Sequence, residues 1–180
     1  MSELAAAALI LGGAIAIVHA PGLLAPERAR AWMAGFPRNK WAGWALTAIT
    51  LGWSAWLVMQ MPLGPFDVYK PLLYGLAPVA FVLIVLLMDE LLAARALGGL
   101  FLLIPSPLLN AARPHESDWR LVITVLAYGF VIAGIILVLC PYRFRKTAAS
   151  WSRSHTACRV WGGAGLILGL VVIALALTVY

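Results

Sequence analysis

The 180-residue chain is 63% hydrophobic and 11% charged, with a formal net charge of +6 and a mean hydropathy of +0.95. Soluble domains have about half apolar and about a quarter charged residues, so this composition excludes an ordinary soluble protein. The length accommodates about six membrane spans of about 20 residues each with short connections, and no separate soluble domain.

We therefore predict an all-α integral membrane protein with six transmembrane helices, forming one domain over residues 1–180. Successive spans are expected to pair into three hairpins at about residues 4–61, 71–112 and 118–180. The basic residues lie in short loops beside apolar runs, where membrane orientation and anionic headgroups account for them. The expected partners are the lipid bilayer and other membrane chains or a second copy, and no nucleic acid.

The first span is predicted at about residues 4–20, where Ala8, Gly12, Ala16 and Ala20 form a small-residue stripe suited to close helix packing. Pro21 and Gly22 are expected to end it. Residues 27–40 then form the first of two short interfacial amphipathic connectors, which is either a plain connector or a lipid-recognition site. The second connector follows Pro141 and leads to residue 159.

The second span, at about residues 41–61, has two different faces. At 100° per residue, Gly43, Thr47, Thr50 and Ser54 share a narrow face suited to contact with another helix. The opposite face is suited to lipid, to a protein partner or to a flat cofactor such as a pigment or quinone. This candidate partner or cofactor face consists of Trp41, Trp44, Trp53 and Trp56.

The third span begins at Pro71 and ends near Asp89 and Glu90. These two are the nearest candidates for ion coupling, since no ionisable residue clearly lies well inside a span. The chain then turns either at residues 89–91 or at Gly98 and Gly99. Either way, residues 89–112 form a full span or a broken or re-entrant helix.

Two prolines interrupt the fourth span near its middle. Pro105 lies about 15 Å of helix beyond Arg95, close to the bilayer midplane. One interpretation is a kink whose freed carbonyls are satisfied by neighbours. The alternative is a broken helix that binds a solute. The candidate residues of that substrate site are Pro105, Ser106, Pro107, Asn110, Asp89 and Glu90.

The last third of the chain resembles the first third. A fifth span at residues 121–140 and a sixth at 160–180 flank the second connector, and Gly165 and Gly169 form a GxxxG step with Gly162 nearby. Both thirds contain a span, a proline, Arg-x-Arg, an aromatic interfacial segment and a glycine-bearing span. This shared order indicates an internal duplication.

A basic residue followed three positions later by glycine opens three of the apolar segments. Such a glycine, one turn inside the span, permits close approach of a neighbouring helix backbone. The three pairs are Lys40 with Gly43, Arg95 with Gly98, and Arg159 with Gly162.

Four potential metal ligands are expected near the same edge of the membrane: His19, Cys140, His155 and Cys158. His19 is the one histidine inside a span, so a two-histidine haem is not supported and the sequence requires no cofactor. Both cysteines are expected to be free thiols in a reducing compartment.

The basic residues predict the orientation. Ten lie on one side of the predicted spans: Arg28, Arg30, Arg38, Lys40, Arg95, Arg143, Arg145, Lys146, Arg153 and Arg159. Lys70, Arg113 and Arg120 lie on the other. The positive-inside rule then predicts a cell-membrane protein with cytosolic connectors and both termini outside.

Three functional hypotheses follow. The first is a non-catalytic subunit or scaffold of a larger membrane assembly, because small-residue faces exceed what six helices need and few charges are buried. The second is a small solute or ion transporter or channel that uses the broken helix at Pro105 and Pro107. The third is a membrane enzyme acting on lipid or quinone with His19 and His155. No catalytic triad, phosphate loop or HExxH motif occurs, so no catalytic residue is assigned.

Overall fold

The computed structural model describes residues 2–88, 91–151 and 153–180. Within these ranges all regular elements are helical, and six helices are long and apolar enough to cross a membrane, as predicted. In chain order the elements are α1 (Glu3–Leu24), α2 (Pro26–Gly35), η1 (Phe36–Arg38), α3 (Lys40–Gln60), η2 (Gly64–Leu72), α4 (Leu73–Leu87), α5 (Leu92–Leu103), α6 (Pro105–Ala112), α7 (Arg120–Leu139), α8 (Tyr142–Trp151) and α9 (His155–Thr178).

Side-chain caps define where three of the long helices begin. The Ser2 hydroxyl accepts a hydrogen bond from the backbone N–H of Ala5 at the start of α1. Asn39 caps α3 and Ser154 caps α9 in the same way, each accepting from the N–H three residues later. These caps satisfy backbone donors that have no partner within the helix.

Helix α1 is longer than the sequence predicted. It continues through Pro21 to Leu24, and the Ala25 N–H bonds to the Pro21 carbonyl. The expectation that Pro21 and Gly22 end the span is therefore wrong. A proline removes only one intrahelical hydrogen bond, and the helix here is held by close packing of Gly22 against Gly162 of α9.

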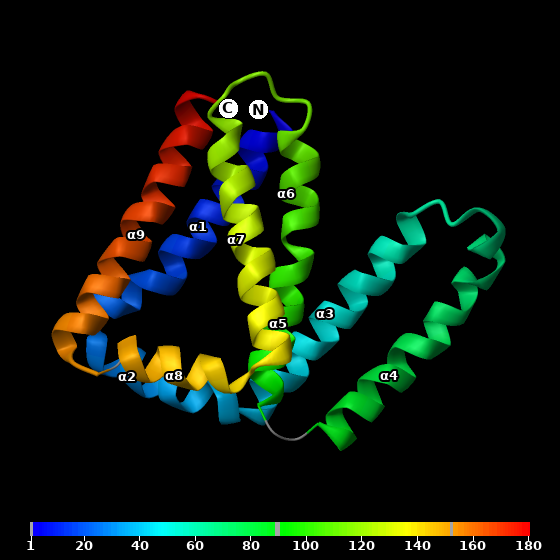
Figure 1. Cartoon of the computed structure of the whole chain (residues 1–180), viewed down its shortest axis with the longest axis horizontal. Helices are drawn as coiled ribbons and strands as arrows, with labels where there is room; N and C mark the ends of the chain where they lie inside the picture. The colour runs from blue at the N-terminus through cyan, green and yellow to red at the C-terminus, as the bar shows by residue number, and fades with distance from the viewer. Residues whose placement is uncertain (1, 89–90, 152) are drawn as a thin grey trace.

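The helices pack in an order different from the three predicted hairpins. The chain does reverse between successive spans, but α1 lies along α9, so the first and last spans form the most extensive pair (Figure 1). Helix α5 packs between α3 and α7, while α6 contacts α7 and α1. Glycines on both helices permit the close pairing of α1 with α9, since Gly12 meets Gly169 and Gly22 meets Gly162.

Glycines set these close contacts. A Cβ added to Gly162 would lie 2.7 Å from the carbonyl carbon of Gly22, and one on Gly98 would lie 3.0 Å from the carbonyl oxygen of Gly134. A Cβ added to Gly43 would lie 3.2 Å from the backbone nitrogen of Ala93. The glycines of all three basic-x-x-Gly pairs therefore touch a neighbouring helix, as their position predicted.

The core lies where both ends of the sequence meet. The Ser2 hydroxyl donates to the Tyr180 carbonyl at 2.6 Å, which ties α1 to the end of α9. The buried residues of this core come from α1, α6, α7 and α9: Leu4, Ala8, Leu11, Leu108, Ala111, Ala112, Ile123, Ala127, Val172 and Ala176.

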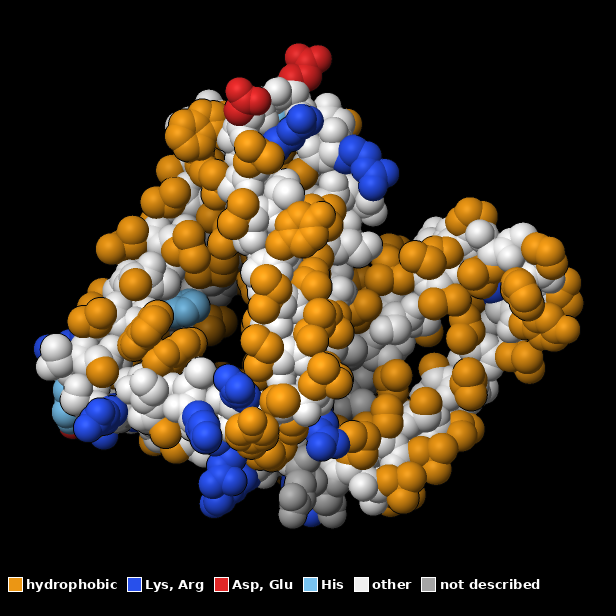
Figure 2. All heavy atoms as spheres, viewed as in Figure 1, with side chains coloured by type: hydrophobic (Ala, Val, Ile, Leu, Met, Phe, Trp, Pro, Cys, Tyr) orange, Lys and Arg blue, Asp and Glu red, His pale blue; other side chains and the backbone are white. Residues whose placement is uncertain are grey.

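Two short helices cross the opposite end of the bundle. Helices α2 and α8 contact each other and lie transverse to the spans (Figure 1). Phe36, the first residue of η1 directly after α2, packs on Phe144 of α8, with ring centroids 5.5 Å apart. Lys and Arg side chains gather over this end in Figure 2. The order of a span, a short helix and a span in α1–α2–α3 recurs in α7–α8–α9, and both short helices have 10 residues.

Candidate functional site

The face of α3 that carries the tryptophans points away from the bundle. Trp41 is 76% exposed and Trp56 is 57% exposed, while Trp44 and Trp53 are half-buried. Small exposed residues lie between the two outermost rings, at Ala45, Ala48 and Gly52. We call the surface of Trp41, Ala45, Ala48, Gly52 and Trp56 the outer face of α3.

The opposite face of α3 packs on α5, as the sequence predicted. Gly43 and Thr47 are buried. The Thr50 hydroxyl lies 2.7 Å from the Leu46 carbonyl and 3.3 Å from the Ala96 carbonyl of α5, to which it donates. Helix α3 is thus held on one side and leaves its tryptophan side uncovered.

Helix α4 is the least packed span. No described residue of α4 is buried, and among the described residues its substantial contacts are with α3 and η2. It lies outside α3, away from the other spans (Figure 1). The side facing away from α3 carries Gly75, Val79, Val82 and Leu86. We call α3, η2 and α4 together the outer hairpin.

The two prolines of the fourth span produce a local interruption and not an unwound segment. Ile104 keeps α-helical torsion angles, and its N–H bonds to the Leu100 carbonyl at 3.1 Å. Helices α5 and α6 together form one apolar helix of 21 residues. The chain turns at Leu91, which has a positive φ of 57°, so α5 continues through Gly98 and Gly99.

The structure describes four of the six predicted substrate residues, Pro105, Ser106, Pro107 and Asn110. Pro105 is buried and Ser106 is half-buried, while Pro107 and Asn110 are exposed on the outside of α6. Asp89 and Glu90 lie outside the described residues. Two cavities at the connector end of the bundle are lined by residues of α2, η1, α8 and the start of α9.

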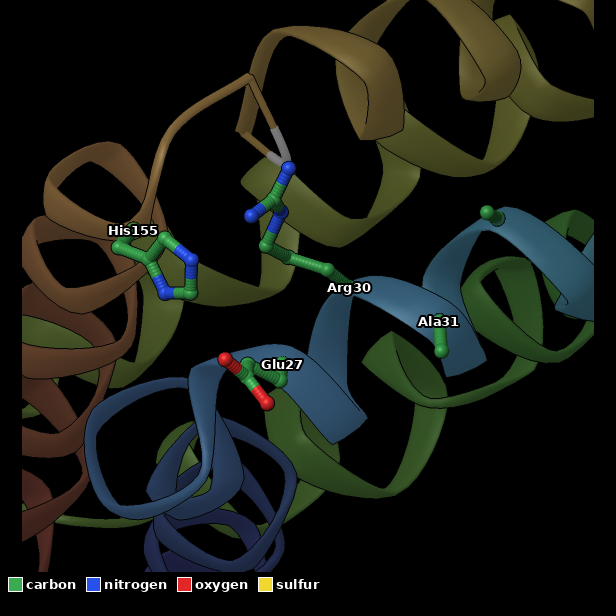
Figure 3. Close-up of a pocket in the computed structure, with 5 residues that line it drawn as sticks. Glu27, Arg30, Ala31 and His155 are labelled. Atoms are coloured by element: carbon green, nitrogen blue, oxygen red, sulfur yellow. The ribbon is translucent and has the colours of Figure 1, made fainter.

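The first cavity, of about 430 Å³, lies between α2 and the beginning of α9. Glu27, Arg30 and His155 surround it, with Ala31 and Ala34 on the remaining wall. The carboxylate of Glu27 and the imidazole of His155 approach the same space, with the Arg30 guanidinium beside it (Figure 3). A carboxylate, an imidazole and a guanidinium thus border one open space and form a polar site whose groups can hydrogen-bond a charged headgroup.

The four predicted metal ligands are placed differently from one another. His19 donates from Nδ1–H to the Ile15 carbonyl, 2.8 Å away, and its ring contacts Gly165 of α9. Cys158 is buried, with Sγ 3.8 Å from the Pro26 carbonyl, and Cys140 follows the end of α7. His155 lines the first cavity. Among the described residues, no three His, Cys, Asp or Glu side chains lie close enough to share a metal ion.

A group of polar contacts that the sequence did not predict joins the end of α9 to the turn between α6 and α7. The Tyr180 hydroxyl donates to the Trp119 carbonyl at 2.6 Å, and its ring lies 5.5 Å from that of His115. Arg120 donates to the His115 carbonyl at 2.6 Å. Burial raises the pKa of the Tyr180 phenol. Its partners are 61 and 65 positions away, so no local pattern signals the contact.

Comparison of the chain with protein-family models, curated proteins and solved structures gives no match. The fold itself defines the class: an all-helical protein whose six long apolar helices are compatible with a multi-pass membrane protein.

Proposed function

We propose that this chain is a non-catalytic integral membrane subunit or scaffold of a larger membrane assembly. The observation that carries the proposal is the outer hairpin, in which α4 has no buried residue and α3 leaves its tryptophan face uncovered. A scaffold needs helix surface beyond that used for its own fold. The outer hairpin has such surface on both of its spans.

Exposure alone does not carry this argument, because lipid chains cover an apolar helix as readily as another helix does. Close association in a bilayer instead requires small residues that let two backbones approach. The outer face of α3 has Ala45, Ala48 and Gly52 between two tryptophans. A partner helix lying there would contact both rings, and aromatic residues are enriched in interfaces.

The proposed setting is the cell membrane, with cytosolic connectors and both termini outside. The support is electrostatic. Helices α2 and α8 carry Arg28, Arg30, Arg143, Arg145 and Lys146 at the end of the bundle opposite the termini. Basic segments next to spans remain in the cytosol under the positive-inside rule.

One observation favours a second candidate function. The cavity between Glu27, Arg30 and His155 has the groups that an enzyme acting on a lipid headgroup or a quinone would use at the membrane edge. His19 does not line it. Unchanged turnover of lipid and quinone substrates by the H155A variant would remove this candidate. The transporter hypothesis gains no comparable support, since Pro107 and Asn110 face outward.

The test of the subunit proposal is the mass and composition of the particle purified gently from native membranes. We expect a discrete complex that contains other chains at fixed stoichiometry. A particle containing this chain alone would contradict the proposal. The next experiment would then be a transport assay that compares the wild type with a variant in which Pro105, Pro107 and Asn110 are all substituted.

A photocrosslinking residue locates the contact within that complex. Placed at Gly52 or Val79, which face outward on the outer hairpin, it should form crosslinks to the partner chain. The matched control positions are Val125 of α7 and Leu170 of α9, which are also exposed but belong to other helices. Equal crosslinking at all four positions would mean that the outer hairpin is not the docking surface.

A further inference from the structure

A second cavity, of about 560 Å³, lies between the end of α2, η1 and α8. Three cations surround it: Arg38 from η1, and Arg145 and Lys146 from α8. The remaining lining residues are Met33, Ala34, Pro37, Tyr142, Ala148 and Ala149. None of the residues that line it is acidic.

The walls of this cavity are held by packing. The Phe36 and Phe144 rings, 5.5 Å apart, join the two sides, and Phe36, Pro37 and Ala148 are buried. The three cations are exposed at the surface around these apolar residues. The cavity therefore combines a cationic rim with an apolar interior.

Three like charges around one space repel each other, and an anion between them relieves that repulsion. Arginine guanidinium groups bind phosphate oxygens through paired hydrogen bonds, while lysine contributes a point charge. The Nζ of Lys146 also lies 5.6 Å from the centre of the Tyr142 ring. Tyrosine is an amphipathic side chain that is typical of membrane interfaces.

We propose that this cavity binds the phosphate headgroup of an anionic phospholipid. Arg38, Arg145 and Lys146 hold the phosphate, and the apolar surface of Met33, Pro37 and Ala148 receives the glycerol and the first methylenes. A zwitterionic headgroup fits less well, because its ammonium group would lie among the three cations. The proposal requires that the six long helices cross a bilayer, and it is independent of the subunit function.

The test is native mass spectrometry of the full chain in detergent, titrated with phosphatidylglycerol, with phosphatidylcholine, or with inorganic phosphate. We expect one phosphatidylglycerol molecule to bind in preference to phosphatidylcholine. The R38Q/R145Q/K146Q variant should lose affinity on the order of 100-fold, since each cation near an anionic headgroup contributes about 1 kcal/mol.

The matched control is R28Q/R143Q/R153Q, which removes the same charge from exposed positions outside the cavity. It should bind phosphatidylglycerol within about fivefold of the wild type, because its cations act only at a distance. A149W fills the cavity and keeps all three cations, so it should also lose binding. Melting temperatures measured beside each titration verify that the variants are folded.

Three outcomes would overturn the proposal. The first is an equal loss of affinity in the two triple variants, which would show general attraction by the basic end. The second is equal binding of the two phospholipids. The third is inorganic phosphate binding as tightly as phosphatidylglycerol, which would show that the apolar interior contributes nothing and that the occupant is a free anion.

Discussion

Adjacent glycines in this chain have different surroundings. Gly12 and Gly162 meet the backbone of the opposite helix, whereas Gly13 and Gly163, one position later, have no atom within 4 Å of an added Cβ. A rotation of 100° per residue accounts for the contrast, because it turns the second glycine of each pair out of the interface. Only the first glycine of each pair is needed for close packing.

We predict that G162A lowers the free energy of unfolding by about 1 to 3 kcal/mol, because the new methyl group overlaps the backbone of Gly22 and Leu23. The control G163A should leave it unchanged or raise it by up to about 1 kcal/mol, since alanine is the better helix former. Reversible unfolding in mixed micelles measures both. Equal losses in the two variants would show that the contact with Gly22 and Leu23 does not decide the result.

Tyr180 makes stability depend on pH. Burial raises its pKa above the ordinary value of 10.0, so above about pH 10 the unfolded chain releases this proton first. The folded state then binds more protons than the unfolded state, and the free energy of unfolding falls as pH rises further. The ionised phenolate also loses the proton that it donates to the Trp119 carbonyl.

Y180F should lower the free energy of unfolding by about 1 kcal/mol near neutral pH, because the hydrogen bond to Trp119 is lost. Above about pH 10 its free energy of unfolding should fall less steeply with pH than that of the wild type. Y128F, at an exposed tyrosine of α7, is the control. Unfolding titrations at neutral and alkaline pH test the prediction. Identical alkaline slopes for the wild type and Y180F would exclude Tyr180 as the source.

Helix α5 connects the outer hairpin to the rest of the bundle, because it packs on both α3 and α7. Its small residues make this possible: Gly98 meets α7 and Gly99 meets the Thr50 side chain of α3. The Thr50 hydroxyl adds a hydrogen bond across the helices. The contact between Thr50 of α3 and the side of α5 that carries Ala96 and Gly99 therefore holds the outer hairpin to the rest of the chain.

T50V should lower the free energy of unfolding by about 0.5 to 1 kcal/mol, since interhelical hydrogen bonds in membranes have about this value. The control is T178V, which removes only a bond within α9 to the Ala174 carbonyl. A loss in T50V no greater than in T178V would show that the contact with Ala96 contributes nothing. Spin-label distances between α3 and α5 would detect any separation of the outer hairpin.

For the whole molecule, one end holds the connectors and the other holds both ends of the sequence with the 113–119 turn (Figure 1). We predict that S117C reacts with an impermeant maleimide in intact cells and that S150C reacts only after permeabilisation. The wild type, with Cys140 and Cys158, measures the background. The reverse pattern would invert the proposed orientation and place the anionic-lipid cavity outside.

By itself, the sequence determined the all-helical class, the six apolar helices, the two faces of α3 and the glycines that touch neighbours. These depend on run length and on a period of 3.6 residues, which are local properties. The substrate site predicted at Pro105 and Pro107 is also a local inference, whereas the burial of each residue of α6 depends on which helices flank it.

Only the tertiary structure decided that α1 pairs with α9, that α1 continues past Pro21, that Tyr180 joins Ser2 and Trp119, and that α2 and α8 enclose a cationic cavity. Each depends on contacts between residues far apart in the chain. Several glycine-bearing helices are similarly suited to one another, so pairing follows from the best simultaneous packing of all six spans, which no single stretch of sequence contains.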